Sequence, residues 1–501
     1  MTLLHDTDHS LLGILLRLSE LLPPAHARFR PLLADALLFF LDHLSPRRQQ
    51  DIFAAQLALP ANASRSRRLL ALFRRCPTLH KLGQVVAHDR RLSGDLRRRL
   101  QELETLVPTD SLVAVRPLLE RAVSDVAGLH IARKALAEAS VAVIVPFVWR
   151  PAGNSAPQQG VFKVLRAGVQ DRLEEELAIW PALGSFLEER CVAHGLPVFD
   201  YANTLESVAH LLAHEVHLDR EQDHLRQAAE FYAGSPDIVI PGVFPFSTPT
   251  VTAMQRVDGC KVTSQDLPAG EMRQRAERLI RALLAQPFWS CGDAGAIFHA
   301  DPHAGNLLAM PDGRLAILDW ALTTTLTKRQ CESVVQLVLG ALTLNDRRVC
   351  AAIAALGQSV DDAQVQAAVR QAIGQVRGGS FPGFEWMTSL LDSLAATSAV
   401  HFPEEVSLFR KALLTLSGVA ADVSQEMTMD SVLIREGASQ FIRSLWWRPW
   451  VWADSRRSGS AHLSNADLFG LGAELPASTL RFWTLAGSRT APRPPRSCDF
   501  L

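Results

Sequence analysis

The segment HADPHAGN, from His299 to Asn306, constrains this chain more than any other stretch of its sequence. Asp301 and Asn306 are five residues apart, a spacing that sets a base and a metal ligand on one phosphoryl-transfer loop. Asp-Pro and Asn are also common in turns, so a polar turn before an ordinary hairpin is the alternative interpretation. That alternative leaves the spacing of the two side chains unexplained.

The residues that follow Asn306 predict a hairpin. Residues 307–310 and 315–318 have strand character, and residues 311–314 between them are typical of a tight turn. In an antiparallel hairpin the start of the first strand lies beside the end of the second, so Asn306 and Asp319 are expected at the same open end. Because Mg²⁺ prefers oxygen ligands, a carboxamide and a carboxylate in that place predict a magnesium site.

Composition excludes several classes of function. At 501 residues the chain is long enough for two or three domains, and 48% hydrophobic with 21% charged residues is typical of a globular protein. A formal net charge of -1 gives no global field that would attract nucleic acid, so no nucleic-acid partner is expected. Seven cysteines are scattered without a CxxC pair or a zinc spacing, which favours reduced thiols in a cytoplasm.

Three features bear on contact with a membrane. No run of 18 apolar residues is present and the N-terminal residues lack a signal-peptide pattern, so a cytoplasmic protein is expected, with peripheral contact at an inner membrane surface as a further option. Residues 65–75 and 89–100 are strongly basic and fit solvated helix faces, or alternatively a docking face for anionic lipid. Tryptophans beside arginines at 445–452 fit a membrane interface and a packed helix end equally well.

The order of predicted elements indicates an α+β fold. Strands are expected at 141–149 and 160–166, helices from Gln170, one long helix over 206–233, and further short strands at 238–246 and 250–257. The chain then divides into a helical extension at 1–135, a smaller lobe at 136–260, a mostly helical lobe at 261–450 and a tail at 451–501. The tail is rich in Ser, Gly, Pro and Arg and is expected to be poorly ordered.

A phosphoryl-transfer site also needs a cation on the nucleotide phosphates, held by a carboxylate. Lys163 lies between apolar neighbours on the second arm of a predicted strand pair, and a lysine on a solvated strand face is the alternative. Glu215 and Glu221 in the following helix are both candidates for the carboxylate. Six residues at about 100° each place these two side chains about 120° apart around a helix, so they should not share one partner.

These residues resemble, in type and order, the UbiB/ABC1/ADCK family of atypical kinases. The resemblance covers roughly residues 70–325, and its most specific parts are the KxGQ motif from Lys81 to Gln84 and the HADPHxGN motif. An alanine-rich segment, residues 137–142, stands where common kinases have a glycine-rich phosphate loop. The resemblance implies a two-lobed protein-kinase-like fold with a helical N-terminal extension, helical C-terminal additions, and ATP and Mg²⁺ as cofactors.

The resemblance also implies a role for each candidate residue. Asp301 and Lys163 would be catalytic, and Asn306 and Asp319 would hold Mg²⁺. The nucleotide would be bound by Lys163, Glu221, Ala139, Ser140, Val141 and Met254. Lys81, Gln84 and Glu215 would belong to an extension that covers the active site, with Lys81 paired to Glu215 and Lys163 paired to Glu221.

Members of this family are linked to ubiquinone or other prenyl-lipid metabolism, which implies ATP hydrolysis or phosphorylation of a small or lipidic acceptor. The chain departs from the family at His217 and His224, at Glu138 in the alanine-rich segment, and at Trp320-Ala321 after the metal aspartate. Of these departures, His217, Glu138 and Ala321 favour a nucleotide-binding pseudokinase scaffold as the alternative function. A small-molecule phosphotransferase is a weaker alternative, because the Lys81 extension would cover the acceptor cleft.

Overall fold

The computed structural model describes residues 20–22, 24–60, 62–86, 111–138, 141–152, 156–197, 200–214, 216–263, 267–444, 462–465 and 469. These residues form two compact units. The first unit contains residues 1–231, 240–257 and 319–322, and the second contains residues 232–239, 258–318 and 323–501. The short stretch 319–322 thus belongs to the first unit although its chain neighbours belong to the second.

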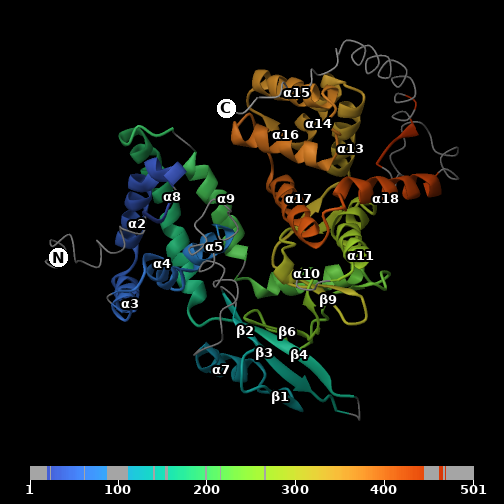
Figure 1. Ribbon diagram of the computed structural model, residues 1–501. Helices are drawn as coiled ribbons and strands as arrows, with labels where there is room; N and C mark the ends of the chain where they lie inside the picture. The colour runs from blue at the N-terminus through green and yellow to red at the C-terminus, as the bar shows by residue number, and fades with distance from the viewer. Residues whose placement is uncertain are drawn as a thin grey trace, which may run out of the picture. The chain divides into compact units, whose positions relative to one another are not determined.

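An antiparallel sheet in the order β1–β3–β4–β6, with β2 beside β3, forms part of the first unit (Figure 1). Its strands are β1 (Leu129–Ile131), β2 (Ala137–Glu138), β3 (Ala142–Trp149), β4 (Gln158–Leu165) and β6 (Val251–Gln255). Residues 160–165 of β4 are all buried, because neighbouring elements cover both faces of this central strand. The β-branched and aromatic residues of β3 and β4 suit such a buried, paired position.

Helices make up the rest of the first unit. They are η2 (Pro24–Phe29), α2 (Arg30–His43), α3 (Pro46–Leu57), α4 (Arg65–Phe73), α5 (Pro77–Val86), α7 (Ser111–Ala122), α8 (Val169–Ala193), α9 (Tyr201–His214) and α10 (Leu218–Phe231). Helix α8 packs against α2, α5 and α9 (Figure 1). Gly184 permits the close approach of α9, because a Cβ atom there would lie 2.6 Å from the Cα of Ala202.

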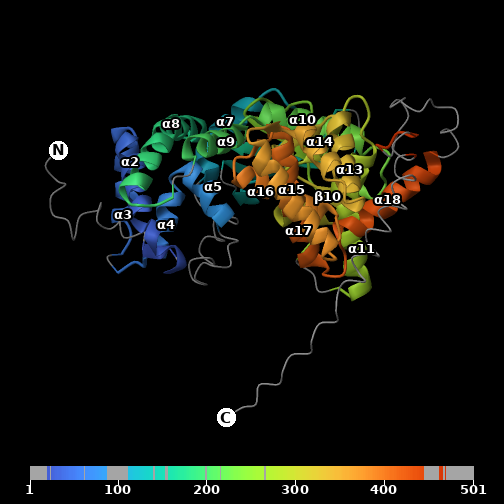
Figure 2. The ribbon, with the colours of Figure 1, turned by 90° about the horizontal axis from the view of Figure 1, so that it is seen from above.

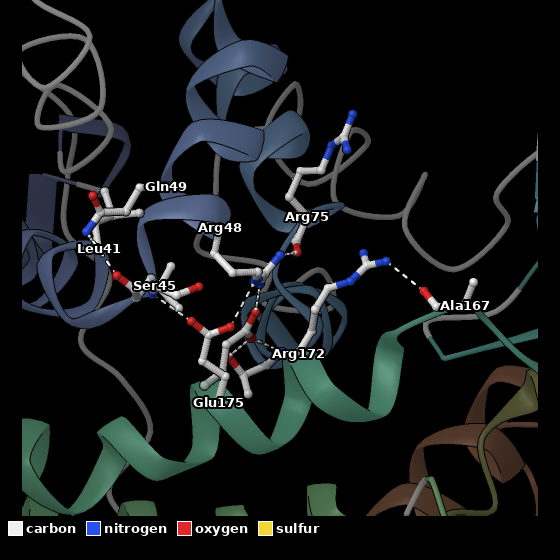
Figure 3. Close-up of polar contacts among 11 residues, drawn as sticks. Leu41, Ser45, Arg48, Gln49, Arg75, Ala167, Arg172 and Glu175 are labelled. Atoms are coloured by element: carbon white, nitrogen blue, oxygen red, sulfur yellow. Dashed lines mark hydrogen bonds and ion pairs between the residues drawn. The ribbon is translucent and has the colours of Figure 1, made fainter.

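A buried polar network fixes α5 to α8. The Glu176 carboxylate on α8 is fully buried and accepts hydrogen bonds from the Thr78 backbone N–H (3.0 Å) and the Thr78 hydroxyl (2.7 Å). The buried Arg48 guanidinium on α3 also donates to Glu176, and donates to the Arg75 carbonyl at 3.0 Å (Figure 3). Since Thr78 lies in the first turn of the helix that carries Lys81, this network sets the position of the KxGQ motif.

The second unit contains a sheet in the order β5–β10–β9–β7, together with two paired ribbons. Its strands are β5 (Ile238–Val239), β7 (Cys260–Lys261), β8 (Ala296–His299), β9 (Leu307–Ala309), β10 (Leu315–Ile317), β11 (Thr323–Leu326), β12 (Gln358–Ser359) and β13 (Val400–His401). Strands β9 and β10 form the predicted hairpin, with Leu307 opposite Ile317. Strand β8 pairs with β11 and leads directly into the HADPHAGN loop.

The helices of the second unit include the group α13 to α17 seen in Figure 2. The helices are α11 (Ala269–Ile280), a π-helical turn η3 (Arg281–Ala285), α12 (Gln286–Trp289), η4 (Ala304–Asn306), α13 (Lys328–Leu342), α14 (Asp346–Leu356), α15 (Asp362–Arg377), α16 (Phe384–Ala396), α17 (Glu404–Val423) and α18 (Met429–Ser444). Thr327 and Gln330 form a reciprocal capping box that starts α13. Within the described part of the chain, no helix combines the length and apolar character needed to cross a membrane.

The α+β class, the hairpin at 307–318, the strands at 141–149 and 160–166 and the helices beyond residue 328 are confirmed. The single long helix over 206–233 is wrong: α9 ends at His214 and α10 begins at Leu218. The 120° separation of Glu215 and Glu221 on one helix therefore does not apply. The expected helical character of residues 1–135 also missed β1, and the strand at 238–246 shrinks to β5 plus a bridge between Val243 and Met254.

Candidate functional site

The candidate cation, Lys163, lies in the middle of β4. Its neighbours across the sheet are Ile144 on β3 and Thr252 on β6. The Lys163 side chain is only 8% exposed, so the solvated-face interpretation of this lysine is wrong. A buried ammonium group needs carboxylate partners, because burial disfavours an unpaired charge.

Two carboxylates meet the Lys163 ammonium within the first unit. Its Nζ lies 2.8 Å from Oε1 of Glu221 on α10 and 3.1 Å from Oδ1 of Asp319. Glu221 is fully buried, whereas the Asp319 side chain is 41% exposed. The structure thus brings Lys163 together with two residues that lie 58 and 156 positions further along the chain. Their roles in nucleotide and metal binding stay predictions.

The charges of this triad are unequal. Burial alone would lower the pKa of Lys163, but the Asp319 and Glu221 carboxylates outweigh it and raise that pKa. Burial raises the pKa of Glu221 to about 7 against the attraction of Lys163, and the nearby Asp319 carboxylate adds to the increase. Both directions follow from two carboxylates that share one ammonium group, which leaves an excess of negative charge.

Helix α10 is held over the sheet by the residue next to Glu221. The buried Gln222 amide donates to the Thr252 hydroxyl (3.0 Å) and to the Thr248 carbonyl (2.8 Å). Thr252 is the residue opposite Lys163 in the β4–β6 pairing. Gln222 therefore aligns Glu221 with Lys163, a function that the sequence analysis did not identify. The available signal was its helical spacing from Leu218 and Leu225, which places Gln222 on the apolar face of a charged helix.

The segment 319–322 has an unusual backbone. Asp319 adopts a left-handed conformation with φ of 51°, which aspartate tolerates better than most residues. The Ala321 N–H donates to Asp319 Oδ1 at 3.3 Å. Trp320 is fully buried, and its carbonyl lies 3.0 Å from Nδ1 of His224, which donates this hydrogen bond. His224, one of the departures from the family pattern, therefore fixes the backbone beside Asp319.

The HADPHAGN loop lies in the second unit and is braced by its own histidine. His299 is buried; its Nε2 donates to the Leu318 carbonyl (3.0 Å), and its Nδ1 accepts from the Asp301 N–H (3.2 Å). The Leu318 N–H in turn donates to the Asn306 carbonyl at 2.8 Å, and Asp319 is the next residue in the chain. These bonds tie the loop to the end of the β9–β10 hairpin.

Asn306 has the geometry expected of an oxygen ligand. Its side chain is buried, and its Nδ2 donates to the Asp301 carbonyl at 3.1 Å. With the amide nitrogen engaged, the side-chain oxygen is the atom that remains to face a cation. The Asp301 side chain is 22% exposed, and it pairs with Nζ of Lys411 on α17 at 3.3 Å. Lys411 was not identified from the sequence.

Other predicted residues are placed less completely. Met254 on β6 lies opposite Val161 and is buried, as is Val141 at the start of β3. Lys81 lies on α5 and is half-buried. Ala139, Ser140, Glu215 and the segments 89–100 and 445–452 lie outside the described residues, as do the side chain of Gln84 and nearly all of the tail.

The side chains of Asn306 and Asp319 are of the type that binds Mg²⁺, the ion that they are predicted to hold. Carboxylate and amide oxygens suit Mg²⁺, and the excess negative charge of the Lys163 triad favours an added cation. Oε2 of Glu221 is buried and has no hydrogen-bond partner in the structure. Buried Lys163 is a cation of the kind that a nucleotide-phosphate site requires, and its role there stays a prediction.

Comparison with known proteins agrees with these features. Residues 127–353 match the model of the ABC1 atypical kinase-like domain. The protein named "probable protein kinase UbiB" of Xanthomonas oryzae pv. oryzae is 27% identical over 262 residues, which cover 51% of this chain and 45% of that protein. "Activity of BC1 complex kinase 3, chloroplastic" of Arabidopsis thaliana is 26% identical over 255 residues, which cover 49% of this chain and 34% of that protein.

Among solved structures, the complex of Rv3197 with erythromycin from Mycobacterium tuberculosis overlaps with a TM-score of 0.43 at 15% identity, covering 63% of this chain and 82% of that chain. The aligned part spans between about a third and half of the two curated relatives. The matched domain contains Lys163, Glu221, the HADPHAGN loop and Asp319. With its α+β, kinase-like fold, the chain is similar to the ABC1 atypical kinase-like domain over residues 127–353.

Proposed function

We propose that this chain binds ATP with Mg²⁺ and acts as an atypical kinase or ATPase of the UbiB type, with a small or lipidic acceptor in quinone or other prenyl-lipid metabolism. The observation that carries the proposal is the buried Lys163 ammonium between Glu221 at 2.8 Å and Asp319 at 3.1 Å. A buried ammonium group with one buried and one partly exposed carboxylate beside it is an arrangement found at sites that bind charged groups. A cytoplasmic location with peripheral membrane contact belongs to the same proposal.

Each residue has a defined task in the proposed reaction. Lys163 neutralises nucleotide phosphates, and Glu221 holds Lys163 in position. Asp301 accepts the proton of an acceptor hydroxyl, or of water, as the acceptor oxygen bonds to the γ-phosphorus. The bond from that phosphorus to the bridging oxygen breaks, and ADP leaves. Asn306 and Asp319 are the residues that would hold Mg²⁺, which neutralises charge on the phosphates.

Thermal shift with Mg-ATP tests binding. The wild type is expected to be stabilised, by about 2.7 kcal/mol when the nucleotide is at 100 times its Kd. Asp319→Asn should lose most of this stabilisation, whereas the control Asp312→Asn should keep it. Asp312 is a suitable control because it lies in the exposed turn of the β9–β10 hairpin and pairs with Arg314. A wild type that Mg-ATP does not stabilise would sink the proposal.

Product analysis tests turnover. ADP and phosphorylated products are measured with and without liposomes that contain prenyl phenols, in wild type and Asp301→Asn. The proposal expects ADP from the wild type and a loss of at least roughly 100-fold in Asp301→Asn, since that variant lacks the proton acceptor. Activity that survives the substitution would exclude Asp301 as the base.

A nucleotide-binding pseudokinase scaffold is the second candidate. One observation favours it: Glu138, an acidic residue within the alanine-rich segment, lies in β2 opposite Val143. An anion there would oppose nucleotide phosphates. Mg-ATP binding without ADP formation under every acceptor condition would support this candidate, and ADP formation abolished by Asp301→Asn would exclude it.

A further inference from the structure

Helix α17 brings a lysine onto the candidate catalytic aspartate. Nζ of Lys411 lies 3.3 Å from Oδ1 of Asp301, with 40% of the lysine side chain and 22% of the aspartate side chain exposed. The two residues belong to the same unit. The other aspartate oxygen, Oδ2, lies 3.8 Å from Nε2 of His303.

The position of Lys411 is set by packing. Phe409, two residues earlier on α17, is buried against Phe298 of β8 with ring centroids 4.9 Å apart. Strand β8 leads directly into the loop that contains Asp301. The neighbouring Arg410, about 100° around the helix from Lys411, pairs with Asp392 at 2.8 Å. Ring packing and an ion pair therefore both restrain the turn of α17 that carries Lys411.

The chemistry of the proposed reaction needs a cation at this place. An acceptor oxygen that gives its proton to Asp301 lies about 3 Å from the carboxylate, and the γ-phosphorus lies roughly 3–3.5 Å beyond that oxygen. A phosphoryl group transferred beside Asp301 would then be a near neighbour of the Lys411 ammonium, which lies 3.3 Å from Asp301 Oδ1. The flexible four-carbon stem and half-exposed position of Lys411 allow movement toward that group.

We propose that Lys411 is a catalytic residue that pairs with Asp301 before transfer and then neutralises the oxygens of the transferred phosphoryl group. The inference rests on the proposed function, because it takes Asp301 as the proton acceptor. In the step, the acceptor proton passes to Asp301, the acceptor oxygen bonds to phosphorus, and ADP carries away the bridging oxygen. Lys411 remains protonated throughout and acts by charge alone.

Chemical labelling tests the position of Lys411 without turnover. An acyl-phosphate analogue of ATP transfers its acyl group to lysines beside the nucleotide phosphates, and labelled peptides are identified by mass spectrometry. Labelling of Lys163 and Lys411, suppressed by excess Mg-ATP, is expected. Lys328 on α13, which pairs with the exposed Asp293 at 3.7 Å, is the control and should show no such competition.

The labelling outcomes separate the two proposals. Labelling of Lys163 without Lys411 would overturn the inference and leave the nucleotide site in place. Absence of competed labelling at both lysines would overturn the proposed function and the inference together.

Kinetics distinguish a catalytic role from an ordinary surface ion pair. Lys411→Met is expected to lower kcat roughly 100-fold with little change in KM, while Lys411→Arg recovers part of the rate. Lys328→Met should retain wild-type kinetics. Melting temperatures within about 2 °C of wild type would show that Lys411→Met still folds. A kcat of Lys411→Met within threefold of wild type, in a chain that hydrolyses ATP, would refute the role.

Discussion

The Glu176 network gives the most direct test of how the KxGQ helix is held. Replacing Glu176 by Ala removes the carboxylate that accepts from the Thr78 N–H, the Thr78 hydroxyl and the Arg48 guanidinium. The two side chains of the ion pair are 8% and 0% exposed. Water therefore cannot readily replace the lost partners, and Arg48 keeps the Arg75 carbonyl at 3.0 Å and a single carboxylate, that of Glu175, at 3.5 Å.

The expected cost follows from these contacts. Breaking a buried ion pair by removing one partner costs about 3–5 kcal/mol. The lower end applies here, because burial raises the pKa of Glu176 to about 7 and so makes the ionised carboxylate itself costly to bury. A loss of about 3 kcal/mol corresponds to a roughly 100-fold larger open population of α5.

Amide hydrogen exchange measures this opening locally. Peptides that cover α5 (Pro77–Val86) should exchange roughly 100-fold faster in Glu176→Ala than in wild type, while α15 in the second unit keeps its protection. Glu174→Ala is the matched control on the same helix. Its exposed carboxylate accepts only from Gln170 at 3.1 Å, a contact worth about 0.2–0.5 kcal/mol.

Hydrogen exchange of α5 can also refute this role of Glu176. Exchange of α5 in Glu176→Ala that stays within threefold of wild type would refute the claim that the network holds this helix. The double variant Arg48→Met with Glu176→Leu should recover the part of the protection lost to the unpaired Arg48 charge, since an apolar pair needs no counter-charge, but not the part lost with the acceptor of the Thr78 N–H and hydroxyl. Failure of that recovery would point to lost packing instead of the unpaired charge.

Three further predictions concern pH and the Lys163 triad. Because the folded pKa of Glu176 is raised from 4.5 to about 7, protonation of this carboxyl group favours the folded state by about 3 kcal/mol below pH ~4.5. This proton-linked stability is separate from the cost of deleting the side chain, and it is lost as pH rises through about 7; Glu176→Gln should flatten that part of the stability profile. Lys163→Met leaves Glu221 buried without its cation, so the free energy of unfolding should fall by about 3 kcal/mol and the thermal shift with Mg-ATP should vanish. An unchanged melting temperature would contradict the ion-pair geometry. His224→Phe removes the bond to the Trp320 carbonyl, worth about 1 kcal/mol, and should weaken the shift with Mg-ATP, whereas a full shift would show that this bond does not position Asp319.

Local sequence signals were sufficient for the β9–β10 hairpin and for β3 and β4. In each case alternating or continuous apolar residues end at Pro, Gly, Asn or Asp, and the partner strand follows within a few residues. The same local signals failed between α9 and α10, because the apolar periodicity continues through the break. Val216 and Leu218 on either side of His217 are both buried, so the turn satisfies the core as well as a helix would.

The sequence alone determined which chemical groups this protein can bring to a site. Oxygen ligands and a phosphate-binding cation were predicted from the HADPHAGN motif, Asp319 and Lys163. Residue type and short spacing in the chain are enough to indicate such groups. Only the tertiary structure decided which partners they have. Glu221 meets Lys163 across 58 residues, and Lys411 meets Asp301 from a distant helix. Such contacts depend on how buried faces pack, and packing between segments far apart in the chain leaves no local pattern to read.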